Sequence, residues 1–329
     1  MSAKTFRSSA PDIRKARTGG CEMSIDYKDL KTEMRNPESG QLDIMPLRDI
    51  LNLFYRQDII VAEAVKKEHK NIADAIGIIH RSLELEGRVF YAGAGTSGRL
   101  GVLDASEIKP TFGVKKKMFI GLIAGGRKAL TTSIEGAEDS RETAVAELKK
   151  YKFAENKNDA VVGITASGMT PYVLSALEHA KAESCATILL TCNKNVAAQY
   201  RGEFDVIIAP DIGSEIISGS TRLKSGTATK MILNMLSTVA MIKAGKVYKN
   251  YMVDLIPACK KLIDRAERIL ADLCSLDMAE AREIYRRSGY NLKAAIVMKE
   301  IGLPLKSARA LLKKNGGHLR SALDTRAKR

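Results

Sequence analysis

Five short apolar runs, spaced widely enough to leave room for helices between them, constrain the fold of this chain more than any other feature. The last four runs are each rich in Val, Ile or Leu. The runs are Arg88–Ala92, Met118–Ile123, Ala160–Ile164, Ala186–Thr191 and Val206–Ala209. Continuous apolar strands that alternate with helices indicate a parallel sheet buried on both faces. We therefore predict a three-layer α/β/α fold and expect the ligand site at the carboxyl ends of the strands.

Most of the remaining chain is predicted to be helical. Residues 1–24 lack apolar periodicity and are rich in Ser, Ala, Gly, Arg and Lys, which predicts a flexible basic tail. Helical periodicity extends from about residue 42 to residue 79 and again over about 224–246. Three short helices, bounded by Gly or Pro, are expected at Met278–Ser288, Leu292–Glu300 and Leu305–Asn315. The predicted organisation is a tail over 1–24, a phosphosugar-type catalytic domain with N-terminal helices over 25–263, and a small three-helix domain over 264–329.

Charge and composition exclude several classes of function. The 329 residues include 53 Lys and Arg against 38 Asp and Glu, but no Trp. Because no stripe of basic and aromatic residues is present, we expect no nucleic acid partner. No apolar run reaches the roughly 18 residues of a membrane span, and the first twenty residues lack a signal-peptide core, so we expect no membrane association. Five scattered Cys without a Cys-x-x-Cys pair favour a reducing, cytoplasmic location and argue against a metal site.

The first predicted strand ends in a glycine-rich loop, Gly93–Gly98, which matches the pattern G-x-G-x-x-G and precedes a helix. This pattern is typical of dinucleotide-binding folds, which also place an acidic residue at the end of the second strand. The second strand here ends without an acidic residue. Arg127 lies at this point and could bind a 2′-phosphate, which leaves an NADP-dependent enzyme as an alternative. Thr96 and Ser97 in the loop are candidate ligands of a phosphate group.

A second loop of hydroxyl and glycine residues follows the third predicted strand. Thr165, Ser167 and Thr170 supply hydroxyl groups, and Gly168 allows close approach of the backbone. Pro171 suits the first turn of the next helix. The free N–H groups of a helix N-terminus can bind a phosphate beside such hydroxyls. Capping of the helix by Ser167 or Thr170 is the structural alternative.

A third cluster of the same kind opens the long predicted helix near residue 224. It contains Ser220 and Thr221 together with the cations Arg222 and Lys224. Three such clusters at the ends of neighbouring elements are less easily explained by helix capping than one would be. They favour a small phosphate ester over a dinucleotide.

The paired glycine and hydroxyl loops are similar to those of sugar isomerase (SIS) domains, which bind phosphosugars. Longer motifs resemble the N-acetylmuramic acid 6-phosphate etherases. They are Thr32–Pro37, Gly93–Glu107, Glu135–Ser140, Gly219–Ala228, Asn234–Thr238 and Met252–Asp254. The resemblance extends from about residue 30 to the C-terminus. Met169 departs from it, because a polar or basic residue is expected at that position of the phosphate loop.

The resemblance implies a cytoplasmic, homodimeric lyase of cell-wall sugar recycling that needs no metal or organic cofactor. Such an enzyme would cleave the D-lactyl ether of N-acetylmuramic acid 6-phosphate to N-acetylglucosamine 6-phosphate and D-lactate, with its site near the subunit interface. Two alternatives share the fold: a non-catalytic phosphosugar-binding regulator and a sugar-phosphate isomerase. A regulator has no need of a pair of carboxylates, whereas the etherase motifs contain one.

By motif position, the proton donor of the family falls on Glu107, and its second catalytic glutamate, the base, falls on Glu138. One carboxylate would remove the hydrogen on carbon 2 of the ring-opened sugar, while a second carboxylic acid protonates the departing oxygen. We expect Glu107 on a loop-to-helix segment directly after the first phosphate loop. Both glutamates are expected near the carboxyl edge of the sheet.

Overall fold

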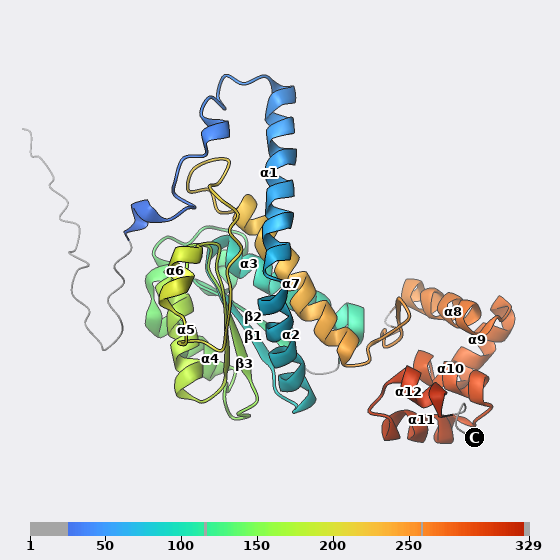
Figure 1. Ribbon diagram of the computed structural model, residues 1–329. Helices are drawn as coiled ribbons and strands as arrows, with labels where there is room; N and C mark the ends of the chain where they lie inside the picture. The colour runs from blue at the N-terminus through green and yellow to red at the C-terminus, as the bar shows by residue number, and fades with distance from the viewer. Residues whose placement is uncertain (1–25, 115–116, 258, 326–329) are drawn as a thin grey trace, which may run out of the picture.

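The computed structural model describes residues 26–114, 117–257 and 259–325, and its centre is the predicted parallel sheet (Figure 1). The five strands lie in the order β2-β1-β3-β4-β5, and every neighbouring pair is parallel. Their bounds are Val89–Gly93 for β1, Phe119–Ile123 for β2, Ala160–Ile164 for β3, Ala186–Leu190 for β4 and Val206–Ile208 for β5. All five predicted strands are therefore confirmed.

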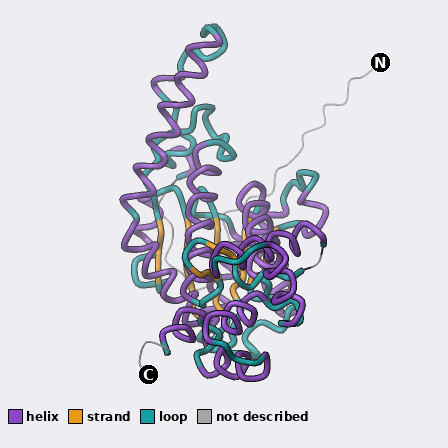
Figure 2. Tube along the Cα trace, turned by 90° about the vertical axis from the view of Figure 1, so that its right-hand side faces the viewer, coloured by secondary structure: helices purple, strands orange, loops and turns teal. Residues whose placement is uncertain are grey.

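Helices cover both faces of the sheet, as the three-layer prediction requires. On one face Tyr91 and its neighbours pack against α1 (Leu47–Lys67), α2 (His69–Glu84), α3 (Gly95–Phe112) and α7 (Lys224–Lys243). On the other face Phe90 packs against α4 (Arg141–Lys150) and α5 (Pro171–Ala182). Successive strand residues point to opposite faces, so continuous apolar runs fill two cores. Figure 2 shows helices on both sides of the strands.

The N-terminal region forms two short 3-10 turns, η1 (Tyr27–Asp29) and η2 (Pro37–Ser39), before α1. The predicted helical stretch over 42–79 is divided into α1 and α2 at Glu68, and α1 extends beyond the sheet (Figure 1). One face of α1 is apolar and exposed, with residues one helical turn apart. They are Leu47, Leu51, Tyr55 and Ile59, which we call the α1 stripe. The predicted tail over 1–24 lies outside the described residues.

The C-terminal part has its own hydrophobic core, separate from the two cores of the sheet. A two-stranded ribbon of β6 (Val247–Tyr248) and β7 (Tyr251–Met252) leads into it. The predicted helices are confirmed as α9 (Met278–Arg287), α10 (Leu292–Ile301) and α11 (Leu305–Lys314). Two further helices, α8 (Lys260–Cys274) and α12 (Leu319–Asp324), were not predicted. The unit stands beside the sheet domain in Figure 1.

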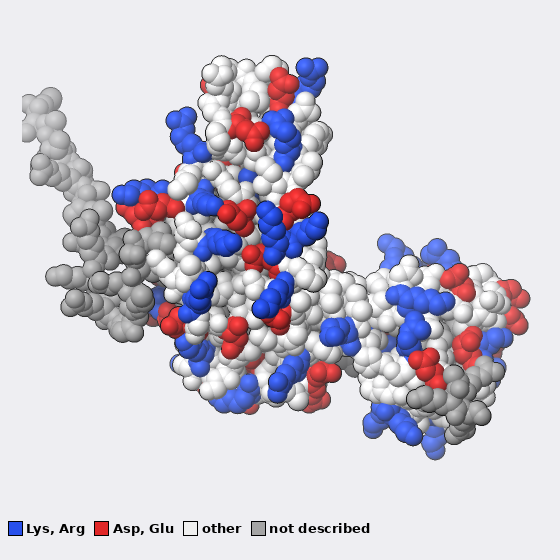
Figure 3. Space-filling model, in the orientation of Figure 1, with Lys and Arg blue, Asp and Glu red and all other residues white. Residues whose placement is uncertain are grey.

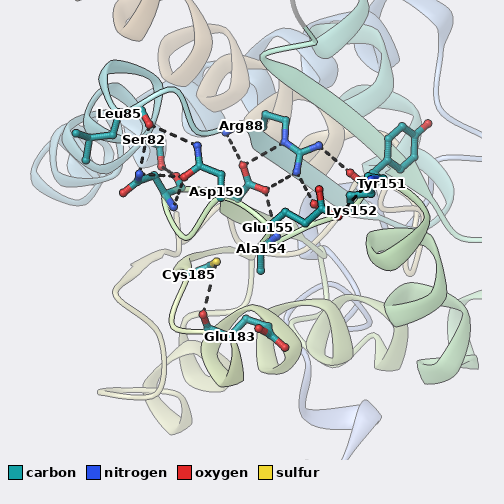
Figure 4. Close-up of polar contacts among 12 residues, drawn as sticks. Ser82, Leu85, Arg88, Tyr151, Lys152, Ala154, Glu155, Asp159, Glu183 and Cys185 are labelled. Atoms are coloured by element: carbon teal, nitrogen blue, oxygen red, sulfur yellow. Dashed lines mark hydrogen bonds and ion pairs between the residues drawn. The ribbon is translucent and has the colours of Figure 1, made fainter.

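At the amino edge of the sheet, Arg88 forms an ion pair with the buried Asp159 (Figure 4). The fully buried carboxylate of Asp159 accepts hydrogen bonds from the backbone N–H of Arg88 at 2.8 Å and from its Nη2 at 2.6 Å. The same guanidinium donates to the carbonyl oxygens of Tyr151 and Lys152. Burial raises the pKa of the nearby Cys185 thiol to about 11, so this thiol is not a nucleophile at neutral pH. These contacts thus hold together the residues that directly precede β1 and β3.

Charged side chains of both signs are interspersed over the face of the molecule drawn in Figure 3. The ion pairs include Lys157 with Glu183 and Lys181 with Glu203. Within the described ranges, no helix combines the length and the apolar character needed to cross a membrane.

Candidate active site

Three helix N-termini meet at the carboxyl edge of the sheet. Helix α3 begins two residues after β1, α5 begins at Pro171 after β3, and α7 begins at Lys224. A Cβ atom placed on Gly226 would lie only 3.6 Å from the methyl carbon of Thr96, so the first turns of α3 and α7 are in contact. Free N–H groups and the positive ends of helix dipoles favour an anion at such a place.

The loop between β3 and α5 gathers three hydroxyl groups, with that of Thr165 between the other two. The Thr165 hydroxyl lies 2.8 Å from that of Thr170 and 3.2 Å from that of Ser167. The N–H of Gly168 donates to the Thr165 hydroxyl, and the N–H of Met169 donates to the Ser167 hydroxyl. Thr170 occupies the N-cap position of α5 without a side-chain capping bond. The three predicted hydroxyls are therefore together, and the Thr170 hydroxyl bonds to Thr165 and not to the backbone of α5.

Met169, the departure in this loop, is explained by the N-terminal segment. Its side chain is only 8% exposed and packs with Leu30 and Val196. An apolar side chain at this position anchors the loop to the segment that precedes α1. The hydroxyl groups of Thr165, Ser167 and Thr170 lie apart from this packing.

The first glycine loop brings β1 and α3 into direct backbone contact. A Cβ atom on Gly93 would lie 2.7 Å from the backbone nitrogen of Gly98, so neither position has room for a side chain. Thr96 and Ser97 lie in the first turn of α3 and are half-buried. The guanidinium of Arg99 donates from Nε to the carbonyl oxygen of Leu130, which fixes the loop after β2 against α3. Both predicted hydroxyls are at the edge.

In the third cluster, the structure separates Lys224 from Ser220 and Thr221. The two hydroxyl residues are half-buried at the start of α7. Lys224 is 2% exposed, and its ammonium donates to the side-chain oxygen of Gln57 at 2.6 Å and to the carbonyl of Ser214 at 2.9 Å. Burial lowers the pKa of Lys224. Its ammonium group is therefore used in internal hydrogen bonds where α1 meets the start of α7.

One residue that the sequence analysis did not single out, Asn193, connects the β3–α5 loop to the N-terminal segment. The Asn193 amide donates to the carbonyl of Ala166 at 2.8 Å and to the Thr32 hydroxyl at 3.3 Å. The carbonyl of Thr32 in turn accepts from the N–H of Gly219. The position of Asn193 in the loop that follows β4 was an available signal, because ligand sites of such sheets are built from the loops after the strands.

The two predicted catalytic glutamates lie in different surroundings, and both are exposed. Glu138 belongs to the 3-10 turn η4 (Ala137–Asp139), which follows β2 and packs against α5. The expected loop position of Glu107 is wrong, because this residue lies inside α3. It follows Gly95 by twelve residues, which at the helical rise of about 1.5 Å per residue is about 18 Å along the axis. Glu107 is therefore not at the carboxyl edge of its own chain.

The reason for this correction is the length of α3. The segment after the glycine loop consists of residues that continue a helix, and Pro110 does not end it. The helix ends at Phe112, where Gly113 adopts a left-handed conformation with φ of 62° and donates its N–H to the carbonyl of Lys109. A Gly at this position is a common helix stop.

Asp104 lies one helical turn before Glu107 and is 5% exposed. Its carboxylate accepts from the Tyr91 hydroxyl at 3.2 Å and lies 3.8 Å from the ammonium of Lys230 on α7. Burial raises the pKa of Asp104, although Lys230 and hydrogen bonds oppose this effect. The cluster joins β1, α3 and α7 beneath the surface on which Glu107 is exposed.

Comparison with known proteins decides the family. Residues 71–181 match the model of the glucokinase regulatory protein N-terminal SIS domain. The chain is 44% identical over 295 residues to an N-acetylmuramic acid 6-phosphate etherase of Salmonella schwarzengrund, covering 90% of this chain and 98% of that protein. It is 46% identical over 301 residues to the enzyme of the same name from Rhizobium rhizogenes, covering 92% and 97%. The chain belongs to the N-acetylmuramic acid 6-phosphate etherase family.

Solved structures resemble the etherase family member only distantly. A phosphoheptose isomerase from Neisseria gonorrhoeae is 15% identical with a TM-score of 0.40, over 59% of this chain and 98% of that chain. These structural similarities are too weak to carry an inference. The etherase motifs themselves are in contact in the structure: the N–H of Gly219 donates to the carbonyl of Thr32, and Thr96 lies against Gly226.

Proposed function

We propose that this chain cleaves the D-lactyl ether of N-acetylmuramic acid 6-phosphate, giving N-acetylglucosamine 6-phosphate and D-lactate in cell-wall sugar recycling. The observation that carries this proposal is identity of 44–46% to etherases over about nine tenths of the chain. The three helix N-termini at one edge support it, because they suit the 6-phosphate. Thr96, Ser97, Thr165, Ser167, Gly168, Thr170, Ser220 and Thr221 are the proposed phosphosugar-binding residues.

The proposed reaction proceeds by elimination followed by hydration. Opening of the sugar ring to its aldehyde acidifies the hydrogen on carbon 2. Glu138 removes this proton, the carbon–oxygen bond at carbon 3 breaks, and Glu107 protonates the lactyl oxygen as it leaves. Water then adds to carbon 3 of the unsaturated aldehyde, and carbon 2 receives a proton. Each carboxyl group can contribute roughly 10²- to 10⁴-fold to the rate.

We further infer that the active unit is a homodimer whose sites are shared between the two chains. The axial distance of about 18 Å between Gly95 and Glu107 exceeds the length of a hexose phosphate. A partner chain could instead place its own Glu107 beside the phosphate-binding helix N-termini of this chain. The exposed α1 stripe supports association, because a contiguous apolar surface of this kind marks an interaction site.

The proposed location of the enzyme is a reducing compartment, the cytoplasm. The described cysteines Cys185, Cys192, Cys259 and Cys274 are all free thiols. Secreted proteins more often pair their cysteines as disulfides. The substrate, a phosphorylated sugar, also belongs inside the cell.

Replacement of each glutamate tests the assignment. Glu107→Gln and Glu138→Gln should each reduce D-lactate release by at least about 10²-fold, because each removes one proton-transfer group. Both variants should bind N-acetylglucosamine 6-phosphate as tightly as the unmodified protein. Glu135→Gln is the matched control, since Glu135 is exposed in the same loop and has no proposed role. Normal turnover by Glu107→Gln would show that the donor is misassigned.

A further inference from the structure

Helices α3 and α7 run side by side, and Asp104 of α3 faces Lys230 of α7 across the seam between them. Their first turns touch at Thr96 and Gly226. Further along, the ammonium of Lys230 lies 3.8 Å from a carboxylate oxygen of Asp104. Because Glu107 follows Asp104 by three residues, the two side chains are neighbours on the surface of α3. Lys230 therefore lies beside the stretch of α3 that also carries the proposed proton donor, Glu107.

Lys230 and Asn234 of α7 have hydrogen-bond donors at this seam that could bind an anion. Lys230 donates to the side-chain oxygen of Asn234, one turn further along α7. Its distance to Asp104 is too long for a hydrogen bond, so part of its donor capacity is left. The Lys230 side chain is 37% exposed, and Asn234 is exposed. Within the part of the chain that the structure describes, the NH₂ group of Asn234 donates no hydrogen bond.

The balance of charge at the seam favours a further negative group. Among the described residues, Asp104 is the one carboxylate within 4 Å of the Lys230 ammonium, and at 3.8 Å it makes no hydrogen bond to it. Tyr91 and Ser237, the other partners of Asp104, are uncharged. Within the described residues, the ammonium of Lys230 therefore donates to an amide oxygen but makes no direct hydrogen bond to a carboxylate. A compact, rotatable cation of this kind is suited to binding a carboxylate.

The proposed substrate carries such a carboxylate next to the bond that breaks. In the lactyl ether the carboxyl carbon is two bonds from the oxygen that Glu107 would protonate. We propose, building on the proposed function, that Lys230 and Asn234 bind the lactyl carboxylate and make the enzyme specific for an acidic ether substituent. The motif Asn234–Thr238 has no proposed part in phosphate binding, and this proposal gives its first residue a role in substrate binding.

The test compares two substrates in two forms of the enzyme. One substrate is N-acetylmuramic acid 6-phosphate, and the other is the same compound with its lactyl carboxylate replaced by a carboxamide. The unmodified enzyme should prefer the carboxylate by about 10- to 100-fold in kcat/KM, the range expected for a hydrogen bond to a charged group. In Lys230→Met this preference should fall to within about threefold, because the carboxylate substrate alone loses its partner.

Three further variants separate binding from folding. Lys230→Arg should retain most of the preference, since it restores the cation. Asn234→Ala, at an exposed position, should lower turnover of the carboxylate substrate by about 3- to 10-fold and leave the carboxamide unaffected. Lys243→Met, an exposed lysine in the last turn of the same helix, should behave as the unmodified enzyme. All variants should bind N-acetylglucosamine 6-phosphate normally, because this product lacks the lactyl group.

Two results would overturn the proposal while leaving the etherase function standing. One is an equal loss of activity by Lys230→Met toward both substrates, which would assign the lysine a structural role. The other is an undiminished preference for the carboxylate in both Lys230→Met and Asn234→Ala. Absence of ether cleavage by the unmodified enzyme with either substrate would instead refute the proposed function, and the proposal with it.

Discussion

The loop that holds the candidate phosphate site depends on Gly168 having no side chain. Its φ is +80°, a conformation that L residues rarely adopt. A Cβ atom at this position would lie 2.8 Å from a methyl carbon of Val196 and 3.0 Å from the Thr191 hydroxyl. Two penalties therefore coincide at one residue, backbone strain and a steric clash.

We predict that Gly168→Ala lowers the free energy of unfolding by about 2–4 kcal/mol, as the sum of left-handed strain and overpacking. The Kd for N-acetylglucosamine 6-phosphate should rise by at least about tenfold, since the N–H groups of the loop are displaced. Gly202→Ala is the matched control: its φ is +82°, but no atom lies within 4 Å of the added carbon. It should cost only about 1–2 kcal/mol and leave binding unchanged. Equal effects of the two substitutions in urea unfolding and titration calorimetry would contradict this account.

Individual side chains show where sequence patterns are sufficient and where they fail. Thr165, Ser167 and Thr170 could be placed from the sequence, because the end of a strand and the start of a helix fix a short loop. The burial of Lys224 could not be foreseen, since it depends on Gln57, which is 167 residues away in the chain. Long-range partners of this kind leave no local pattern.

Among the secondary-structure elements, the strands were the most predictable. A strand buried on both faces is a continuous apolar run, and its pattern does not depend on which neighbour it pairs with. The predicted helices α9 to α11 were likewise marked by Gly or Pro at their ends. Helix α8 escaped prediction although its apolar residues recur at helical spacing on one buried face.

Helix α3 shows the functional consequence of misjudging the length of an element. The glycine loop marks its beginning, but its end depends on Gly113 adopting a left-handed conformation that allows the chain to turn. A Cβ atom on Gly113 would lie 1.6 Å from the carbonyl oxygen of Asp254, so the stop is also set by a distant segment. Motif position therefore identified Glu107 as a candidate, while its distance from the phosphate loops required the structure.

Glu107 is distant from the proposed phosphate site of its own chain. For the assembled protein, this separation predicts that two inactive variants restore activity when they form a mixed dimer. Glu107→Gln and Glu138→Gln, mixed after joint unfolding and refolding, should regain about a quarter of the unmodified activity. Half of the dimers would be mixed in a two-fold symmetric assembly, and each would contain one site with both glutamates intact. Refolded samples of either variant alone are the control. If each site were built from one chain, the mixture would stay inactive.

The most direct test of the central claim, ether cleavage by elimination and hydration, is turnover of N-acetylmuramic acid 6-phosphate in deuterium oxide. We predict that D-lactate is released in an amount equal to the N-acetylglucosamine 6-phosphate formed, and that the sugar product carries deuterium at carbon 2. Mass spectrometry and NMR of the product measure both quantities. Release of lactate with carbon 2 still fully protonated would contradict proton abstraction by a carboxylate, and absence of lactate would contradict the proposed function.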